Sequence, residues 1–212
     1  RLWGKKVYAW GHGDKAFKGR SRHYVKWFYK HCDGFFTYGE GGKARLVELG
    51  IPEDKLHVIY NSLNNGVDPI AQAVYNSTIV NEHFNNGLPT VVFVGRLTKV
   101  KRLDWIIDAQ DHHFKKGIKY NVLIIGDGKE ADSLKELAAS KHLDDHIWFY
   151  GECYDDEKLS VLLYNSDLCV SPGNVGLTAL HSMIYGTPVI SHSDFETQMP
   201  EYEVIMPGKT GD

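Results

Sequence analysis

Two cations follow a short apolar segment in the second half of the sequence. Residues 90–95 read TVVFVG, Arg96 comes next, and Lys101 lies five residues further on. An arginine binds a phosphate through two parallel hydrogen bonds, and a lysine adds a compact positive charge. The spacing therefore predicts a diphosphate site after this segment, with two ordinary surface cations on a loop as the open alternative.

A second candidate site is a glycine-containing segment that follows another apolar run. Residues 171–178 read SPGNVGLT, in which Gly173 and Gly176 would let the backbone approach a ligand closely. A helix that begins near Gly176 would offer its first N–H groups, which have no partners within the helix, to phosphate oxygens. A tight turn with glycine for packing is the alternative. The triplet GDG at 126–128 lacks the third glycine of a dinucleotide-binding motif, so it predicts a turn without a dedicated ligand contact.

Short apolar segments alternate with amphipathic stretches along most of the chain. Strands are expected at residues 6–10, 34–38, 57–60, 90–95, 121–126, 146–150, 167–171 and 188–191, and helices at 21–32, 43–49, 103–114, 129–140, 155–165 and 177–185. This alternation is typical of an α/β fold with doubly wound parallel sheets. Ligands bind such sheets outside the carboxyl ends of the strands, where residues 96–101 and 171–178 are expected to lie.

Composition and charge exclude several classes of protein. The chain has 212 residues, 42% of them hydrophobic, and a formal net charge of −3, so it is not a globally basic nucleic-acid binder. No apolar run approaches the roughly 18 residues of a membrane span. The cysteines Cys32, Cys153 and Cys169 are widely spaced, which indicates a reducing, cytoplasmic location. No set of His, Cys, Asp and Glu residues has the spacing of metal ligands, so no metal is expected.

The amino-terminal segment is strongly basic. Residues 1–31 contain nine lysines and arginines and a single acid, Asp14. Within residues 15–30 these cations alternate with aromatic residues, namely Phe17, Tyr24, Trp27, Phe28 and Tyr29. A helix with this pattern can lie on an anionic membrane surface, which would place the protein peripherally on the inner face of the cell membrane. A helix that packs its aromatic side chains into its own domain is the alternative.

Several short motifs follow one another along the chain. They are Trp10-Gly11-His12-Gly13, Cys32-Asp33-Gly34, Val58-Ile59-Tyr60-Asn61, Gly95-Arg96-Leu97, Ile125-Gly126-Asp127-Gly128, Phe149-Tyr150-Gly151, Gly176-Leu177, Gly186-Thr187-Pro188-Val189-Ile190 and Pro200-Glu201. In this order they resemble the retaining glycosyltransferases of family 4 (glycosyl transferases group 1), which have the GT-B fold of two Rossmann-like domains. The resemblance implies that residues 1–64 are the C-terminal part of an incomplete acceptor domain and 65–87 an interdomain linker. Residues 88–212 would form the nucleotide-sugar donor-binding domain, without its last helices.

The resemblance also implies roles for individual positions. Arg96 and Lys101 match the pair that holds the nucleotide diphosphate, and His12 matches a histidine near the transferred sugar, so these three are the expected catalytic residues. The segment 151–154 matches a loop that packs on the nucleobase, and 176–178 matches the helix start whose amides meet the phosphates. The expected donor-binding residues are Gly95, Arg96, Lys101, Gly151, Cys153, Tyr154, Gly173, Asn174, Gly176, Leu177, Thr178 and His181.

One feature of the family pattern is missing. The family has a glutamate that touches the sugar hydroxyls and, after seven intervening residues, a second that touches the ribose. Gly173 and His181 stand at these positions. Asn174 is expected to bind sugar hydroxyls, and His181 to bind a ribose oxygen. Because histidine titrates near pH 6.5, nucleoside diphosphate binding is expected to strengthen between about pH 7.5 and 6.

The resemblance implies retaining transfer of a hexose from a nucleotide-diphosphate sugar to an acceptor hydroxyl. The acceptor would be a saccharide or a polyprenyl-linked saccharide in the biosynthesis of bacterial surface polysaccharide or lipopolysaccharide. Neither a cofactor nor a nucleic-acid partner is expected. Two alternatives stay open: a GT-B nucleotide-sugar epimerase, and a non-catalytic scaffold that binds a nucleotide or a sugar.

Overall fold

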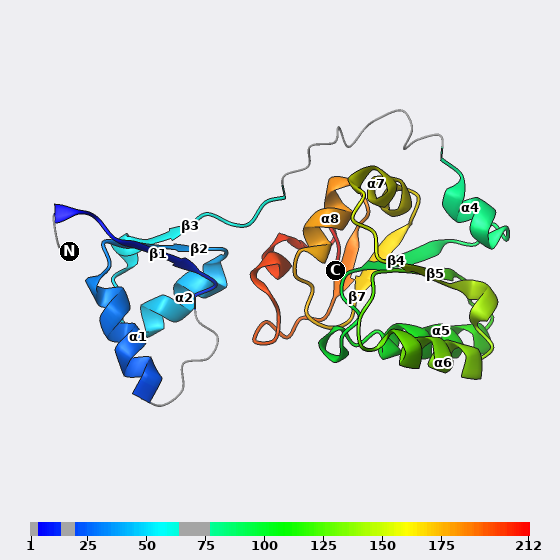
Figure 1. The fold of residues 1–212 in the computed structure, drawn as a ribbon, viewed down its shortest axis with the longest axis horizontal. Helices are drawn as coiled ribbons and strands as arrows, with labels where there is room; N and C mark the ends of the chain where they lie inside the picture. Colours follow the sequence, from blue (N-terminus) through cyan, green and yellow to red (C-terminus); the bar gives the residue numbers. More distant parts are fainter. Residues whose placement is uncertain (1–3, 14–19, 64–76) are drawn as a thin grey trace. The chain divides into compact units, whose positions relative to one another are not determined.

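The computed structural model describes residues 4–13, 20–63 and 77–212 of the chain. The chain divides into two compact units, Arg1–Ser62 and Leu63–Asp212 (Figure 1). Each unit is built on a parallel sheet whose strands are connected through helices. The predicted α/β fold with two parallel-sheet blocks is confirmed.

The first unit contains a three-stranded parallel sheet in the order β1-β2-β3. Its elements are β1 (Tyr8–Gly11), α1 (Arg20–His31), β2 (Gly34–Thr37), α2 (Glu40–Glu48), the 3-10 helix η2 (Glu53–Lys55) and β3 (Leu56–Val58). A small core packs Phe35 and Leu56 of the sheet against Leu46 of α2. Just beyond the end of α2, Gly50 adopts a left-handed φ of +80°, a conformation that suits glycine after a helix.

The second unit contains a five-stranded parallel sheet in the order β6-β5-β4-β7-β8. Its strands are β4 (Thr90–Val94), β5 (Asn121–Ile125), β6 (Ile147–Gly151), β7 (Leu168–Ser171) and β8 (Val189–Ser191). Its helices are α4 (Ile79–Phe84), α5 (Asp104–Lys115), α6 (Ala131–Ser140), α7 (Asp156–Tyr164) and α8 (Thr178–Ile184), with 3-10 helices η3 (Lys99–Lys101), η4 (Asp144–His146) and η5 (Pro200–Val204). The sheet grows from β4 first on the β5 side and then on the β7 side, so its topological switch point lies between the carboxyl ends of β4 and β7.

Helices cover the two faces of this sheet in two groups (Figure 1). On one face, Ile107 of α5 and Leu134 of α6 pack in a cluster with Phe93 of β4. On the other face, α4, α7 and α8 pack in a cluster that includes Leu162 and Val92. Val92 and Phe93 are consecutive and point to opposite faces, which explains why this strand is a continuous apolar run in the sequence.

The segment predicted as a linker, residues 65–87, contains a packed helix at its end. Residues 65–76 lie outside the described part of the chain. Within residues 77–87, α4 forms, and Val80 is buried in a core cluster of the second unit while Phe84 packs against it. These two side chains are four residues apart and therefore share one face of the helix. The end of the predicted linker thus belongs structurally to the second unit.

An apolar groove runs beside α5 on the face that α5 and α6 cover. Its volume is about 600 Å³, and its lining includes Trp105 and Ile106 of α5, Val170 of β7 and Ile190 of β8. Trp105 and Ile190 are exposed. The β7–β8 side of this face is therefore less completely covered than the centre of the sheet.

Candidate functional site

Main-chain hydrogen bonds join the loops at the carboxyl edge of the second sheet. The Gly95 N–H donates to the Ile125 carbonyl over 2.9 Å, and the Gly126 N–H donates to the Gly151 carbonyl over 2.7 Å. A Cβ atom on Gly126 would lie 2.0 Å from the Gly95 carbonyl oxygen, and the φ of Gly126 is +140°, so this position requires glycine. We call residues 95–97, 125–128 and 151 the main-chain frame. The GDG triplet, which the sequence predicts to be a simple turn, is part of this frame.

Lys101 lies at the switch point between β4 and β7. Its Nζ donates a hydrogen bond to the Asn174 carbonyl over 2.6 Å and lies 3.8 Å from where a Cβ atom on Gly176 would be. Burial and the positive charge of Arg96 lower the pKa of Lys101, while the charge of the buried Glu201 acts in the opposite direction. The structure thus brings the two predicted cations within electrostatic range. An anion bound beside them would relieve their mutual repulsion.

The loop after β7 has no room for a side chain at position 173. Gly173 is buried, and its N–H donates to the Lys101 carbonyl over 3.1 Å. A Cβ atom there would lie 2.0 Å from the Val100 carbonyl oxygen. A glutamate at this position would force the two loops apart. The close packing of the backbone at position 173 therefore explains why the glutamate of the family pattern is missing. The half-buried Asn174 is the next residue of this loop and offers a polar side chain.

Gln198 is a buried residue of this region that the sequence does not reveal. Its Oε1 accepts a hydrogen bond from the Val175 N–H over 2.9 Å. Its Nε2 donates to the Ser191 Oγ over 2.8 Å and to the His192 carbonyl over 2.9 Å. The side chain therefore ties the loop after β7 to the segment after β8. Gln198 lies in an irregular segment without a motif or a period, so the sequence holds no signal that could have identified it.

Residues 176–178 lead into α8. Gly176 has a left-handed φ of +53°, and α8 begins at Thr178. The Thr178 hydroxyl donates to the Val94 carbonyl over 2.7 Å, so this buried side chain anchors the helix to the end of β4. Leu177 is exposed. Because the first N–H groups of a helix lack intrahelical partners, this segment can offer hydrogen-bond donors close to Lys101.

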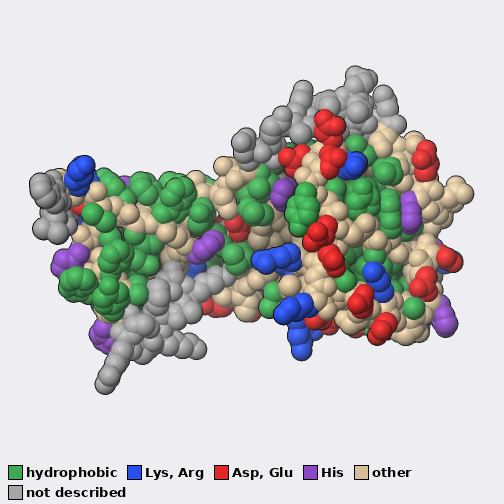
Figure 2. Space-filling view, viewed as in Figure 1, with side chains coloured by type: hydrophobic (Ala, Val, Ile, Leu, Met, Phe, Trp, Pro, Cys, Tyr) green, Lys and Arg blue, Asp and Glu red, His purple; other side chains and the backbone are tan. Residues whose placement is uncertain are grey.

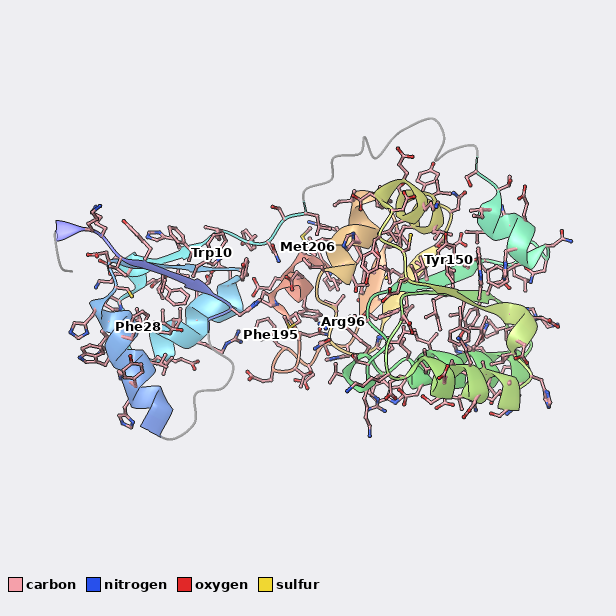
Figure 3. All side chains as sticks on the ribbon, in the orientation of Figure 1. Trp10, Phe28, Arg96, Tyr150, Phe195 and Met206 are labelled. Atoms are coloured by element: carbon pink, nitrogen blue, oxygen red, sulfur yellow. The ribbon has the colours of Figure 1, made fainter. Side chains whose placement is uncertain are left out.

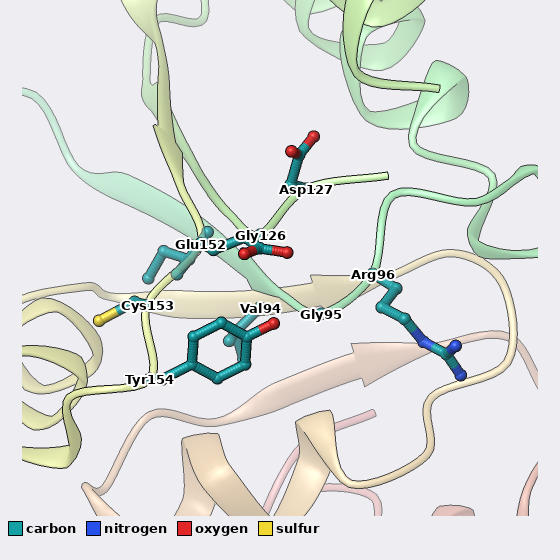
Figure 4. A pocket seen from close by; sticks show the side chains of 9 residues that line it. Val94, Gly95, Arg96, Gly126, Asp127, Glu152, Cys153 and Tyr154 are labelled. Carbon is teal, nitrogen blue, oxygen red and sulfur yellow. The ribbon is translucent and has the colours of Figure 1, made fainter. Parts of the chain in front are cut away.

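A pocket of about 140 Å³ lies between the ends of β4, β5 and β6 (Figure 4). It is lined by the predicted residues Gly95, Arg96, Cys153 and Tyr154 and by Val94, Ile125, Gly126, Asp127 and Glu152. In Figure 4 the Tyr154 ring lies near Val94 and Gly95, whereas Arg96 extends away from Tyr154. The negative charge of Glu152, together with a hydrogen bond between the two side chains, raises the pKa of Tyr154. The carboxylates Asp127 and Glu152, which have no predicted role, give the pocket acceptor groups beside an exposed phenol.

His181 lies in the second turn of α8 and is half-buried. Burial lowers the pKa of His181, and the negative charge of Asp156 opposes this change only in part. The ring therefore takes up its proton at a lower pH than an ordinary histidine. The predicted strengthening of nucleotide binding between about pH 7.5 and 6 assumed an ordinary histidine pKa, and it stays a prediction. A neutral imidazole can still donate or accept one hydrogen bond.

His12, the third predicted catalytic residue, belongs to the first unit. It follows β1 and is exposed, and its ring centre lies 4.9 Å from that of Tyr38. The loop is held against α2, because a Cβ atom on Gly13 would lie 2.4 Å from the Gly42 Cα, and Arg45 Nε donates to the Gly13 carbonyl over 2.9 Å. The proximity of His12 to a donor sugar stays a prediction.

The basic helix α1 exposes three aromatic side chains. Tyr24, Trp27 and Phe28 are 68%, 57% and 43% exposed. Lys30 on the same helix is also exposed. Hydrophobic side chains cover much of the face of this unit that Figure 2 shows. Residues 14–19, which include part of the segment predicted to meet a membrane, lie outside the described part of the chain.

The described residues contain neither a cluster of metal ligands nor a membrane-spanning helix. No group of three or more His, Cys, Asp or Glu side chains within residues 4–13, 20–63 and 77–212 is arranged to hold a metal ion. In the same ranges, no helix combines the length and the apolar character needed to cross a membrane.

Among the cysteines, burial raises the pKa of the Cys169 thiol to about 12, so this thiol is unreactive at neutral pH.

Two units with parallel α/β sheets are typical of the GT-B class of proteins. We call Arg96 and Lys101, at the switch point of the second sheet, the cationic corner. Solved structures of this type are similar to the chain. Anabaena HepE in complex with UDP matches with a TM-score of 0.74 and 16% identity, over 98% of this chain and 57% of that one. The apo lipopolysaccharide outer core galactosyltransferase WaaB matches with a TM-score of 0.72 and 18% identity, over 97% of this chain and 54% of that one.

Residues 76–211 match the family model described as Glycosyl transferases group 1, and residues 2–68 match Glycosyltransferase Family 4. The chain belongs to the glycosyl transferases group 1. An uncharacterised glycosyltransferase of Methanocaldococcus jannaschii is 29% identical over 175 residues, 78% of this chain and 43% of that protein. The Escherichia coli lipopolysaccharide 1,6-galactosyltransferase is 24% identical over 196 residues, which cover 87% of this chain and 48% of that protein. The Streptococcus pneumoniae alpha-monoglucosyldiacylglycerol synthase is 29% identical over 113 residues, which cover 51% of this chain and 25% of that protein. The chain spans less than half the length of these curated relatives.

Proposed function

We propose that this chain carries the nucleotide-sugar site of a retaining glycosyltransferase, which moves a hexose from a nucleotide-diphosphate sugar to an acceptor hydroxyl. The observation that carries the proposal is the cationic corner at the switch point. There the Lys101 ammonium is fixed on the Asn174 carbonyl with Arg96 in electrostatic range. Family membership supports the transferase chemistry, and the similarity to HepE, solved with UDP and with UDP-glucose, supports a nucleotide-sugar donor.

In this proposal the two cations act on the leaving group. Negative charge grows on the diphosphate as its bond to the sugar breaks. Lys101 is already held by the Asn174 carbonyl before the reaction, and Arg96 adds a second positive charge within electrostatic range, so stabilising that charge needs little reorganisation. The first N–H groups of α8 add donors on the same side. The positive field comes from the chain itself, and the proposed mechanism therefore uses no metal and no cofactor.

The nucleoside is assigned to the 140 Å³ pocket on the β5–β6 side of the corner. Arg96 lines this pocket and also acts on Lys101, so it would connect the nucleoside to the diphosphate. Tyr154 supplies an exposed aromatic ring, and Asp127 and Glu152 supply carboxylate acceptors for N–H and O–H groups. His181 would meet the ribose as a neutral ring.

We further propose that the acceptor is membrane-associated. Exposed aromatic side chains with cations on one helix, as on α1, fit an anionic lipid surface at the level of the headgroups. Relatives named for lipopolysaccharide and for monoglucosyldiacylglycerol support an acceptor that contains a lipid, and the first of them supports a saccharide acceptor in surface polysaccharide or lipopolysaccharide biosynthesis. The protein would then act peripherally on the cytoplasmic face of the membrane.

The proposal is tested first by calorimetry with UDP, GDP and ADP on the chain as it stands. At least one nucleoside diphosphate should bind, and binding should depend on Arg96 and Lys101. A chain that binds none of the three would contradict the proposal. Turnover of the matching nucleotide sugar then separates a transferase from a scaffold that only binds its ligand.

A further inference from the structure

The segment that leads into η5 packs against the loop after β7 through two consecutive residues. Gln198 accepts a hydrogen bond from the Val175 N–H over 2.9 Å. Met199 follows, and a Cβ atom on Gly176 would lie 3.9 Å from the Met199 Cγ and 3.8 Å from the Lys101 Nζ. The Met199 side chain and the Lys101 ammonium therefore flank the same glycine, which has no side chain to separate them.

The helix η5 carries a buried carboxylate. Glu201, its second residue, is 5% exposed, and Pro200 before it is buried as well. Phe195 and Met206, which precede and follow η5, lie at the same end of the second unit as Arg96 in Figure 3. Removing a carboxylate from water is unfavourable unless cations or hydrogen-bond donors compensate it. The burial of Glu201 therefore calls for positive charge at this edge of the sheet.

The charge of Glu201 acts on Lys101. Burial and the positive charge of Arg96 lower the pKa of Lys101, whereas the negative charge of Glu201 raises it. Residues 172–177, the loop that holds the ammonium, contain no ionisable side chain, and their hydrogen bond to it comes from the neutral Asn174 carbonyl. Glu201 thus opposes both influences that favour the loss of the proton from Lys101.

We propose that Glu201 is a positioning residue of the diphosphate site, a buried counter-charge that keeps Lys101 protonated and in place. The inference rests on the proposed function, which assigns Lys101 to the diphosphate. A carboxylate exposed in the site would repel the phosphates, but Glu201 is buried and acts on the ligand through Lys101. The competing role is a structural one, in which Glu201 holds η5 in its fold and has no effect on the ammonium.

The test measures the pKa of Lys101 directly. In a chain labelled with carbon-13 lysine, NMR follows the Cε resonances between about pH 7 and 11, around the ordinary lysine pKa, and Lys101→Met identifies the Lys101 signal by its loss. Glu201→Gln and Glu201→Met remove the charge, so the answer does not depend on the folding of either one, and Glu201→Asp retains it. Glu196→Gln, an exposed carboxylate of the segment before η5, is the control. Melting temperatures establish that each variant folds.

The neutral variants should lower the pKa of Lys101 by at least about half a unit, whereas Glu201→Asp and Glu196→Gln should leave it within about 0.2 units of wild type. Calorimetry with UDP, GDP and ADP supplies the second readout. Nucleoside diphosphate binding should weaken as Lys101 loses its proton, and at alkaline pH the neutral variants should bind about threefold more weakly than wild type. The ionisation of the ligand is the same for every variant and cancels in this comparison.

An unchanged pKa of Lys101 in the neutral variants overturns the inference. A nucleotide affinity that changes by the same factor at every pH also overturns it, because a structural role of Glu201 would produce that result. In both cases the proposed function survives if nucleotide binding still depends on Lys101. A chain that binds none of the three nucleotides contradicts the proposed function instead, and NMR still decides whether Glu201 acts on Lys101.

Discussion

The Lys101 ammonium and the Asn174 carbonyl oxygen, 2.6 Å apart, connect the loop after β4 to the loop after β7. These strands are neighbours in the sheet, yet they are separated in the chain by β5 and β6. A lysine at this point reaches both halves of the sheet. Its partner is a neutral carbonyl, so the hydrogen bond fixes the position of the positive charge without cancelling it.

Removing either cation of the corner should weaken nucleoside diphosphate binding. Arg96→Ala and Lys101→Met each delete a charge-assisted hydrogen bond, which we expect to cost about 1.5–3 kcal/mol of binding free energy, or roughly a ten- to hundredfold rise in Kd. Lys99→Ala, in the same 3-10 helix but exposed, is the control and should leave Kd within about twofold. Calorimetry measures all three. Equal affinities in wild type and both corner variants would refute the diphosphate assignment.

Gln198→Leu should weaken the binding of UDP more than that of uridine. The variant leaves the buried Val175 N–H without its partner, which costs about 1–3 kcal/mol of stability and loosens the loop beside the diphosphate. Gln110→Leu is the matched control. Gln110 is a buried glutamine whose Nε2 donates to the Tyr120 carbonyl over 2.8 Å, away from the site. We expect a similar fall in melting temperature for both variants and a change in the ratio of UDP to uridine affinity only for Gln198→Leu. If both variants shift that ratio equally, Gln198 has no positioning role.

Gly126→Ala should destabilise the second unit by at least about 2 kcal/mol, because it combines a positive φ with a clash against the Gly95 carbonyl. Gly117→Ala is the control. Gly117 also has a positive φ, of +81°, but no atom lies within 4 Å of where its Cβ would be, so we expect a loss of only about 1 kcal/mol. Denaturant unfolding gives both free energies of unfolding. Equal losses of unfolding free energy would show that the contact with the Gly95 carbonyl adds nothing to the cost of a side chain at position 126.

His181 should make the folded chain less stable at acid pH. The unfolded chain protonates this ring near pH 6.5, whereas burial lowers the pKa of His181 in the folded state. As the pH falls through 6.5, the unfolded state therefore binds more protons, and the free energy of unfolding decreases. His181→Gln removes this contribution. The free energy of unfolding of the variant should therefore fall less between pH 7.5 and pH 5.5 than that of wild type. These two pH values lie about one unit above and below the ordinary histidine pKa. The exposed His112, changed to Gln, serves as the control and should follow the wild-type profile.

The basic aromatic face of α1 should bind anionic vesicles in a salt-dependent manner. Sedimentation with vesicles rich in anionic lipid should carry the chain down at low salt. The bound fraction should fall as salt rises, because screening shortens to about 8 Å near 0.15 M. Trp27→Ala and Lys30→Glu should each reduce the bound fraction, and Lys129→Glu, an exposed lysine of the second unit, should have less effect. A bound fraction that changes neither with salt nor in these variants would contradict the proposal that α1 binds an anionic lipid surface.

The parallel strands of the second unit, and the position of Arg96 and Lys101 directly after one of them, could be predicted from the sequence because they follow local rules. Runs such as 90–94 and 121–125 are apolar on both faces, which predicts buried parallel strands. The alternation with helices then predicts their carboxyl ends as the ligand edge. The strand ends 90–95 and 121–126 were expected within one residue of where the structure has them.

The rest of the site depends on contacts between segments that are distant in the sequence. Gln198 meets Val175 across 23 residues, and nothing in the irregular segment around it predicts this. The approach of Gly173 to the Val100 carbonyl and the burial of His181 are likewise properties of packing. The sequence therefore shows that a carboxylate is missing at position 173, but only the structure shows that no side chain fits there.

In the main-chain frame, backbone groups hold the loops of the binding edge together, and different residues supply the side chains that would select the nucleotide. Hydrogen bonds between backbone groups join its three segments, so replacing Glu152 or Tyr154 leaves the frame in place. Asp127 differs, because its side chain accepts a hydrogen bond from the Gly128 N–H over 2.7 Å, and Gly126 has no room for a side chain. Sequences can therefore diverge widely around a retained scaffold, as the match to HepE at 16% identity and a TM-score of 0.74 illustrates. For protein engineering, a combinatorial library at positions 152 and 154 is accordingly a route to new nucleotide preferences that keeps the hydrogen bonds of the frame.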